Sequence, residues 1–95
     1  MTDNGVEQIR KLVNLSGLHL GETKVTDKGL IHLRDMQKLQ QLWLDDTMIT
    51  DGGIDHLAKL QSLAELHIRG TKITAGGLNR LQRSLPQCRI ESAVK

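Results

Sequence analysis

The 95-residue sequence has almost no aromatic residues: it contains one Trp, no Phe and no Tyr. A conventional core of this size uses several aromatic side chains, because each of them buries a large apolar area. The apolar residues are instead mostly Leu, with some Ile and Val, within a hydrophobic fraction of 38%. This composition favours a thin core assembled from similar layers.

Cysteine and charge of one sign are also scarce. The single cysteine, Cys88, excludes an internal disulfide and a metal site made of several cysteines. The formal net charge is +2 and no long basic run occurs, so we expect no nucleic-acid partner. No apolar run is long enough to span a bilayer, and the first ten residues lack the apolar stretch of a signal peptide. We therefore expect no membrane partner, and the cytoplasm is the favoured compartment.

The most informative feature is an internal repeat of 24 residues. The triplet Leu18–Leu20 recurs at 42–44 and again at 66–68, and Thr, Gly and Leu follow each triplet at constant spacing. The aligned positions include Thr23, Thr47 and Thr71, then Thr26, Thr50 and Thr74, and then Gly29, Gly53 and Gly77. A fixed period of this length predicts a stack of repeated units.

The repeat register predicts a single domain over residues 1–95. Subtracting one period aligns Thr2 and Gly5 with the repeat, so the chain begins within a unit. At the other end, residues 85–90 fit the strand pattern after a two-residue deletion, which places Cys88 at a core leucine position. The expected units are a partial repeat over 2–14, repeats over 15–38, 39–62 and 63–84, and a terminal partial repeat over 85–95.

Each unit is expected to form one strand and one short helix. The alternation in Leu18–Leu20 is typical of a half-buried strand. The Thr before each helix is a good N-cap, because its hydroxyl accepts a hydrogen bond from a free backbone N–H, and Asp27 and Asp51 add negative charge there. The recurring glycine suggests that a Cβ would clash between layers. Strands are predicted near 18–20, 42–44, 66–68 and 88–90, and helices near 3–12, 27–36, 51–60 and 75–84.

These segments resemble the leucine-rich-repeat proteins, and more narrowly a bacterial subtype with the pattern L-x-x-L-x-L-x-x-T-x-[IV]-T-D-x-G-L-x-x-L-x-x-L. The segments that carry the resemblance are LSGLHLGETKVTDKGLIHL, LQQLWLDDTMITDGGIDHL and LAELHIRGTKITAGGLNRL. The resemblance implies an α/β solenoid, a right-handed β-α superhelix with parallel strands on a concave face and short helices on a convex face. Thr23, Thr47 and Thr71 stand where many such repeats carry Asn or Cys, and we expect them to hydrogen-bond the turn of the next layer.

The concave face is the binding surface that the resemblance implies, and the alternation predicts which side chains project from it. A central column holds His19, Trp43, His67 and Arg89. Trp43 is either a contact residue for a partner or a ring packed flat across its strand neighbours. Arg69 beside Asp45 predicts a cross-strand ion pair. The candidate partner-binding residues are His19, Gln41, Trp43, Asp45, Glu65, His67, Arg69 and Arg89.

No arrangement of residues points to catalysis or metal binding. His19 and His67 lie two strands apart, roughly 9–10 Å, whereas zinc needs ligand nitrogens ~2.0–2.1 Å away. Cys88 has no base beside it in the repeat register and is expected in the core. We therefore expect no catalytic residue, metal or cofactor. The sequence favours a non-catalytic module that binds a protein or peptide through the concave face. The alternative is a structural or self-associating segment of a longer array with no separate ligand, and its exposed solenoid ends are the place where a homo-oligomer would form. An enzyme is the least supported hypothesis.

Overall fold

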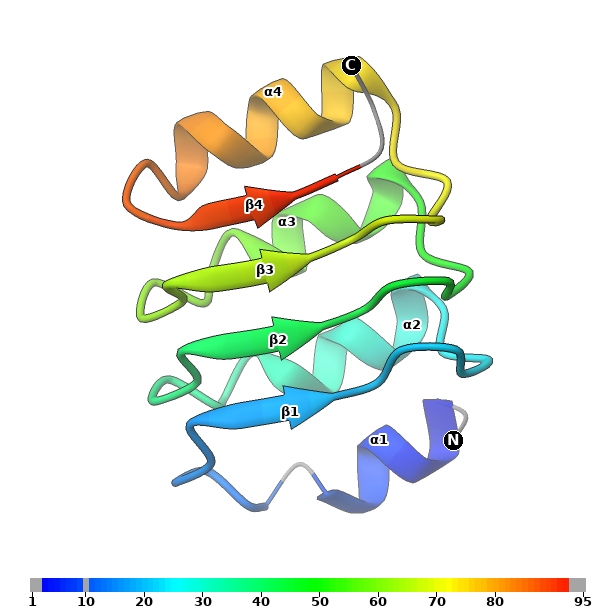
Figure 1. Ribbon diagram of the computed structural model, residues 1–95. Helices are drawn as coiled ribbons and strands as arrows, with labels where there is room; N and C mark the ends of the chain where they lie inside the picture. Colours follow the sequence, from blue (N-terminus) through cyan, green and yellow to red (C-terminus); the bar gives the residue numbers. More distant parts are fainter. Residues whose placement is uncertain (1–2, 10, 93–95) are drawn as a thin grey trace.

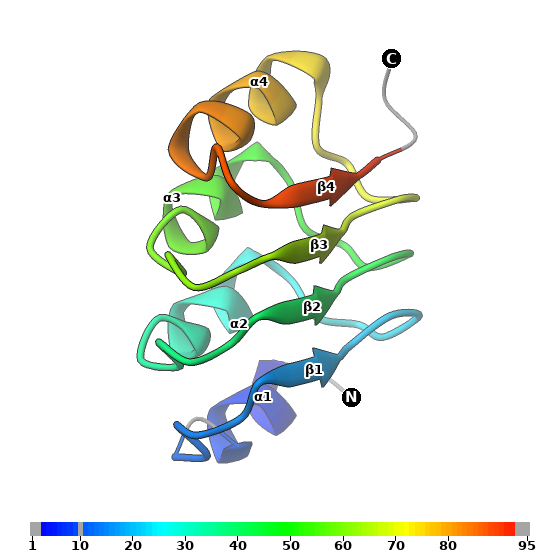
Figure 2. The ribbon, with the colours of Figure 1, turned by 60° about the vertical axis from the view of Figure 1, so that its left-hand side comes forward.

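The computed structural model describes residues 3–9 and 11–92, and its strands and helices alternate in stacked layers (Figure 1). The strands form one sheet in the order β1-β2-β3-β4, and every neighbouring pair is parallel. The helices all lie on one side of this sheet (Figure 2). The predicted α/β solenoid architecture is confirmed.

The elements follow the predicted order along the chain. They are α1 (Asp3–Ile9), β1 (Gly17–His19), α2 (Asp27–Leu30), η1 (Ile31–Leu33), β2 (Gln41–Trp43), η2 (Asp51–Gly53), α3 (Ile54–Leu57), β3 (Glu65–His67), α4 (Ala75–Ser84) and β4 (Arg89–Glu91). The two inner helices predicted as continuous are each split into an α-helical and a 3₁₀ piece. The predicted helix over 3–12 ends earlier, at Ile9, and Arg10 lies outside the described residues.

The last helix is longer than the inner ones for a visible reason. In the inner layers the helical segment ends at Leu33 or Leu57, and a buried Met36 or Leu60 follows within three residues. In the last layer that position is the exposed Ser84, and α4 continues to it. Leu85 then fills the core directly after the helix.

The strands pair in an unbroken register. Leu18 pairs with Leu42, Leu42 with Leu66, and Leu66 with Ile90, so paired residues are 24 apart at each of these junctions. The predicted two-residue deletion is therefore wrong, and Ile90 rather than Cys88 takes the strand leucine position. The residues between Leu85 and β4 form a turn, in which the Cys88 N–H donates to the Leu85 carbonyl at 3.0 Å.

The repeated threonines after each strand close turns within their own layer. The Thr47 hydroxyl donates to the carbonyl of Leu44 at 2.8 Å, three residues earlier in the chain. Thr23 and Thr71 make the same bond, to Leu20 and Ile68. The predicted bonds to the next layer are therefore wrong, because a threonine hydroxyl reaches a carbonyl in its own turn more easily than one in another layer.

A second set of threonines, at the helix starts, does join the layers. The Asp27 carboxylate accepts from the backbone N–H of Thr50 at 2.7 Å and from its hydroxyl at 2.5 Å. The Thr50 hydroxyl also accepts from the Gly52 N–H, which confirms the predicted N-cap. The same arrangement links Asp3 to Thr26 and Asp51 to Thr74.

The recurring glycine lies against this interlayer contact. A Cβ on Gly53 would lie 2.7 Å from an oxygen of Asp27 and 2.6 Å from a methyl carbon of Leu30, both in the preceding layer. Gly29 and Gly77 face Asp3 and Asp51 in the same way. The predicted clash is confirmed. We call this repeated arrangement the helix-start row; it consists of Asp3, Thr26, Asp27, Gly29, Thr50, Asp51, Gly53, Thr74 and Gly77.

Candidate binding face

The concave face is the side of the sheet that is turned away from the helices (Figure 2). Its central column holds His19, Trp43, His67 and Glu91, each paired with the next across neighbouring strands. Glu91 therefore takes the place predicted for Arg89. Arg89 instead pairs with Glu65 in the flanking column, because no deletion precedes β4.

Three aromatic rings stack along the central column. The ring centroids of His19 and Trp43 are 5.6 Å apart with an interplanar angle of 16°, and those of Trp43 and His67 are 5.4 Å apart at 8°. The spacing of neighbouring strands, about 4.8 Å, brings these rings into contact. Both faces of the Trp43 ring are thus covered by imidazoles, so the flat packing considered in the sequence is present. Trp43 therefore presents the edge of its ring to solvent and not its faces.

Charged side chains surround the β3–β4 end of the column. The Glu91 carboxylate accepts from Arg89 Nε at 2.7 Å and from Arg69 Nη2 at 3.4 Å. The hydrogen bond and the positive charge of Arg89, with help from Arg69 and His67, hold the pKa of Glu91 below its usual value. A shallow hollow of about 380 Å³ is lined by Asp45, His67, Arg69, Arg89 and Glu91.

The predicted ion pair between Asp45 and Arg69 is wrong. Asp45 Oδ1 accepts from the backbone N–H of Arg69 at 2.7 Å, while the guanidinium group lies against Glu91. The reason lies in the register, which places Glu91 directly beside His67, within reach of the Arg69 side chain. Because of this register, the Arg69 side chain pairs with Glu91. The Asp45 carboxylate, which the sequence predicted as its partner, accepts from the backbone N–H of Arg69 instead.

The opposite end of the face has few side chains. Gly17 and Gly21 flank His19, and a Cβ on Gly17 would meet only ordinary contacts, the nearest at 3.6 Å from the Gln41 side-chain oxygen. The main chain of β1 is therefore accessible from the concave side at Gly17, whereas the His19 ring lies against Gly21, where an added Cβ would be 3.1 Å from His19 Cε1. The concave face therefore carries few and uncharged side chains at its β1 end and charged side chains at its β4 end.

The candidate residues predicted from the sequence all belong to these columns. The structure brings His19, Trp43 and His67 into one stack, and it places the half-buried Glu65 3.3 Å from His67 Nε2. Gln41 lies exposed in the flanking column. Glu91 is the residue that the candidate set missed, and adding 24 to His67 without a deletion would have found it.

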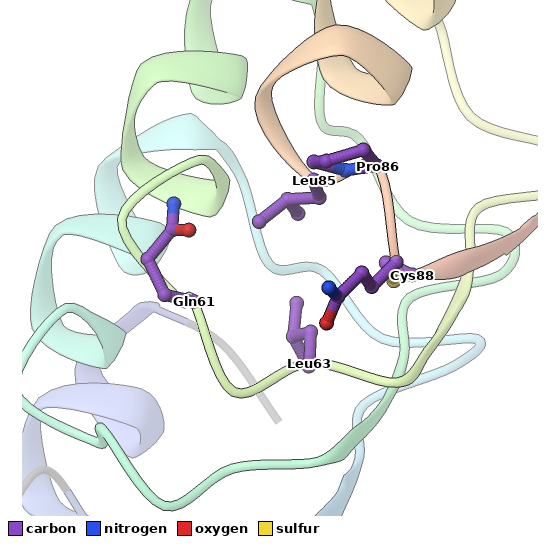
Figure 3. Close-up of a pocket in the computed structure, with 6 residues that line it drawn as sticks. Gln61, Leu63, Leu85, Pro86 and Cys88 are labelled. Carbon is purple, nitrogen blue, oxygen red and sulfur yellow. The ribbon is translucent and has the colours of Figure 1, made fainter.

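Cys88 borders a different feature, a small hollow of about 190 Å³ beside the turn after α4 (Figure 3). The thiol is half-buried rather than a full core residue, and Ile90 has the position predicted for it. Burial, with the nearby charge of Glu65, raises the pKa of Cys88, so the thiol stays protonated and is a weak nucleophile. Across residues 3–9 and 11–92, no three His, Cys, Asp or Glu side chains form a metal-binding group. No helix in those ranges has the length and apolar character to cross a membrane.

The comparisons with known proteins identify the architecture. No protein-family model and no curated protein matches this chain. A solved structure of a leucine-rich-repeat protein from Leptospira interrogans superposes with a TM-score of 0.63 and 21% identity over 88% of this chain. The chain has the leucine-rich-repeat fold. It spans 27% of the length of that Leptospira chain.

At 21% identity the similarity to the Leptospira structure shows the fold of this chain and not its role. Stacked repeats create a continuous sheet face that a partner can contact across several layers. A fold alone does not name the partner, because unrelated functions use the same architecture. The function has to be argued from the side chains on the concave face.

Proposed function

We propose that this chain is a non-catalytic module that binds a protein or peptide through its concave face. The observation that carries the proposal is the ring column of His19, Trp43 and His67 on the sheet face that is turned away from the helices. The repeat requires Leu or Ile on the core side of each strand, but it does not require rings on the solvent side. This column is therefore a property of this chain and not of its architecture.

The stack suits a contact surface because its rings are already ordered. Each imidazole covers one face of Trp43, so the three side chains lose little rotamer freedom when a partner arrives. A partner would contact the ring edges and the accessible main chain at Gly17. The charged groups at the β3–β4 end would orient it, because charge complementarity contributes mainly to specificity and association rate.

The contacts among the titratable groups of the concave face favour a scaffold role over a catalytic one. Its titratable groups are engaged with one another: Glu91 with Arg69 and Arg89, and His67 with Glu65. A catalytic base needs a nucleophile or a substrate proton within hydrogen-bond reach, whereas His67 Nε2 lies 3.3 Å from a carboxylate oxygen of Glu65.

The test replaces the central ring. Peptides selected from a display library against the wild-type chain are assayed on Trp43→Ala, with Ile31→Ala as the control. Ile31 is also an exposed apolar residue, but it lies in η1 on the helical side. An interface tryptophan contributes about 2 kcal/mol or more, so we expect Trp43→Ala to weaken binding about 30-fold and Ile31→Ala to leave it unchanged.

Circular dichroism and thermal unfolding of both variants separate loss of binding from loss of structure. Peptides that bind Trp43→Ala as tightly as the wild type would rule out the concave face as the contact surface. Peptides that lose binding to Ile31→Ala instead would place the contact on the helical side.

A further inference from the structure

Two arginines protrude from the charged end of the concave face. The side chain of Arg69 is 64% exposed and that of Arg89 is 77% exposed, whereas Glu91, which both of them contact, is 24% exposed. These side chains line the same hollow, together with Asp45 and His67. A ligand that approaches the hollow therefore meets guanidinium groups before it meets a carboxylate.

Glu91 holds the two guanidinium groups close together. Its Oε1 accepts from Arg89 Nε and its Oε2 accepts from Arg69 Nη2, so each arginine donates one N–H to it. The hydrogen bond from Arg89 and the charges of both arginines hold the pKa of Glu91 below its usual value, so Glu91 is ionised near neutrality. It neutralises one of the two positive charges. A guanidinium group has several further N–H donors, arranged as a planar fork that matches a carboxylate.

The other carboxylates at this end of the face are engaged with neighbours of their own. Asp45 is half-buried, and its Oδ1 accepts from the backbone N–H of Arg69 at 2.7 Å. Glu65 is also half-buried, and its Oε2 lies 3.3 Å from His67 Nε2. The negative groups are thus less exposed than the two guanidinium groups. The charge that a ligand reaches first at this end of the face is positive.

We propose that the peptides bound by the concave face carry an acidic side chain, Asp or Glu, that binds Arg69 and Arg89 together. The carboxylate of the peptide accepts from N–H donors that Glu91 does not use, while Glu91 keeps the two guanidinium groups in place. Charge-assisted hydrogen bonds of this kind are stronger than those between neutral groups. This inference rests on the proposed binding function and names the class of peptide that the face selects.

The distance from the arginines to the ring column determines the spacing of residues in the peptide. Trp43 lies in β2, Arg69 follows β3 and Arg89 lies in β4, so the arginines are one to two strand spacings of about 4.8 Å away from Trp43. An extended peptide rises about 3.3 Å per residue, and it covers this distance in two or three residues when it runs across the strands. We therefore expect the acidic residue two or three positions from an apolar residue that contacts the edge of Trp43.

The test uses peptides selected from a random display library against the wild-type chain. They are synthesised with amidated C-termini, so that only side chains supply carboxylates, and their binding is measured by fluorescence anisotropy. We expect them to contain Asp or Glu at the spacing given above. Replacing this residue by Asn or Gln should weaken binding to the wild-type chain about tenfold, because the charge-assisted hydrogen bonds are lost. The same replacement should not weaken binding to the double variant Arg69→Gln/Arg89→Gln.

Two further variants separate recognition by these arginines from a general effect of charge. Arg83→Gln is the matched control, since Arg83 is also exposed but lies in α4 on the helical side of the sheet; it should bind the acidic peptides as the wild type does. Glu91→Gln should bind them more tightly, because it removes the negative charge beside the two guanidinium groups. Circular dichroism of each variant checks that the fold is retained.

The outcomes distinguish this inference from the proposed binding function. Peptides whose amide versions bind the wild type equally tightly, but which Trp43→Ala binds weakly, would overturn the inference and leave the binding function standing. An equal loss of affinity in Arg83→Gln and in the double variant would also overturn the inference, because net charge alone would then explain it. A library that yields no binding peptide would overturn both.

Discussion

The helix-start row and the concave face both connect neighbouring layers, but they use different kinds of residues. The row repeats Asp, Thr and Gly from layer to layer, while the central column of the face reads His, Trp, His and Glu. The row is constant because each layer must fit against the one before it. The face can vary because its side chains project into solvent. Substitutions in the row should therefore change the free energy of unfolding, and those in the face should change it little.

The largest effect is expected at Gly77. Its added Cβ would lie 2.2 Å from Asp51 Oδ1 and 2.7 Å from a methyl carbon of Ile54, so Gly77→Ala should lower the free energy of unfolding by about 2 kcal/mol. The neighbouring Gly76 is the matched control, because the nearest atom to its Cβ would be the Thr74 hydroxyl at 3.8 Å. Gly76→Ala should raise the free energy by up to about 1 kcal/mol, since alanine favours helix.

Urea unfolding of both glycine variants gives the comparison directly. Effects of the same sign at the two positions would contradict the assignment of Gly77 to an interlayer contact.

The second effect concerns the carboxylate in the row. Asp27→Ala removes the two carboxylate oxygens that accept from the Thr50 N–H and hydroxyl. Urea unfolding should therefore show a free energy of unfolding that is lower by about 1–2 kcal/mol. Asp27→Asn retains an acceptor for the N–H and should cost less. Lys28→Ala, at the exposed next position, is the control. An Asp27→Ala variant as stable as Lys28→Ala would show that the interlayer bonds add nothing.

The period predicted the architecture well, because it identifies equivalent positions. The strand centres, the N-cap threonines and the glycine clash all follow from it. It does not identify hydrogen-bond partners. Thr47 bonds within its own turn and not to the next layer. The bond between Asp27 and Thr50 was not predicted, although the same pair of residue types recurs at the same spacing of 23 residues in Asp3 and Thr26.

The concave face was harder to predict near the end of the repeat. The stacking of Trp43 was one of two interpretations, since alternation gives the side of the sheet and not the ring orientation. The sequence placed Arg89 and not Glu91 in the central column because Leu85 and Pro86 resemble the start of a strand segment. In the structure Leu85 instead fills the core directly after α4, and the strand keeps its 24-residue spacing.

A smaller effect should appear in acid. Hydrogen bonds from the hydroxyl and N–H of Thr74 hold the pKa of Asp51 below its ordinary value of 3.8. A carboxyl whose pKa is lowered by folding stabilises the protein above its unfolded pKa, and that contribution is lost as the pH falls through the folded value. The difference in unfolding free energy between wild type and Asp51→Asn should therefore be constant near neutrality and shrink below pH ~4. A difference that does not change with pH would contradict the role of the ionised carboxylate.

The smallest effect is expected on the concave face, at Arg69. Its guanidinium group pairs with Glu91 at 3.4 Å and is largely exposed to solvent, and such surface ion pairs contribute about 0–1 kcal/mol. Arg69→Ala should therefore change the free energy of unfolding by less than about 0.5 kcal/mol at moderate salt, and the difference should shrink further as salt screens the pair. Peptides selected on the wild type should nevertheless bind this variant more weakly, because the charged end of the face has lost a group that orients them. A loss of stability as large as that of Asp27→Ala would place Arg69 with the helix-start row, and would mean that the face serves the architecture as much as the row does.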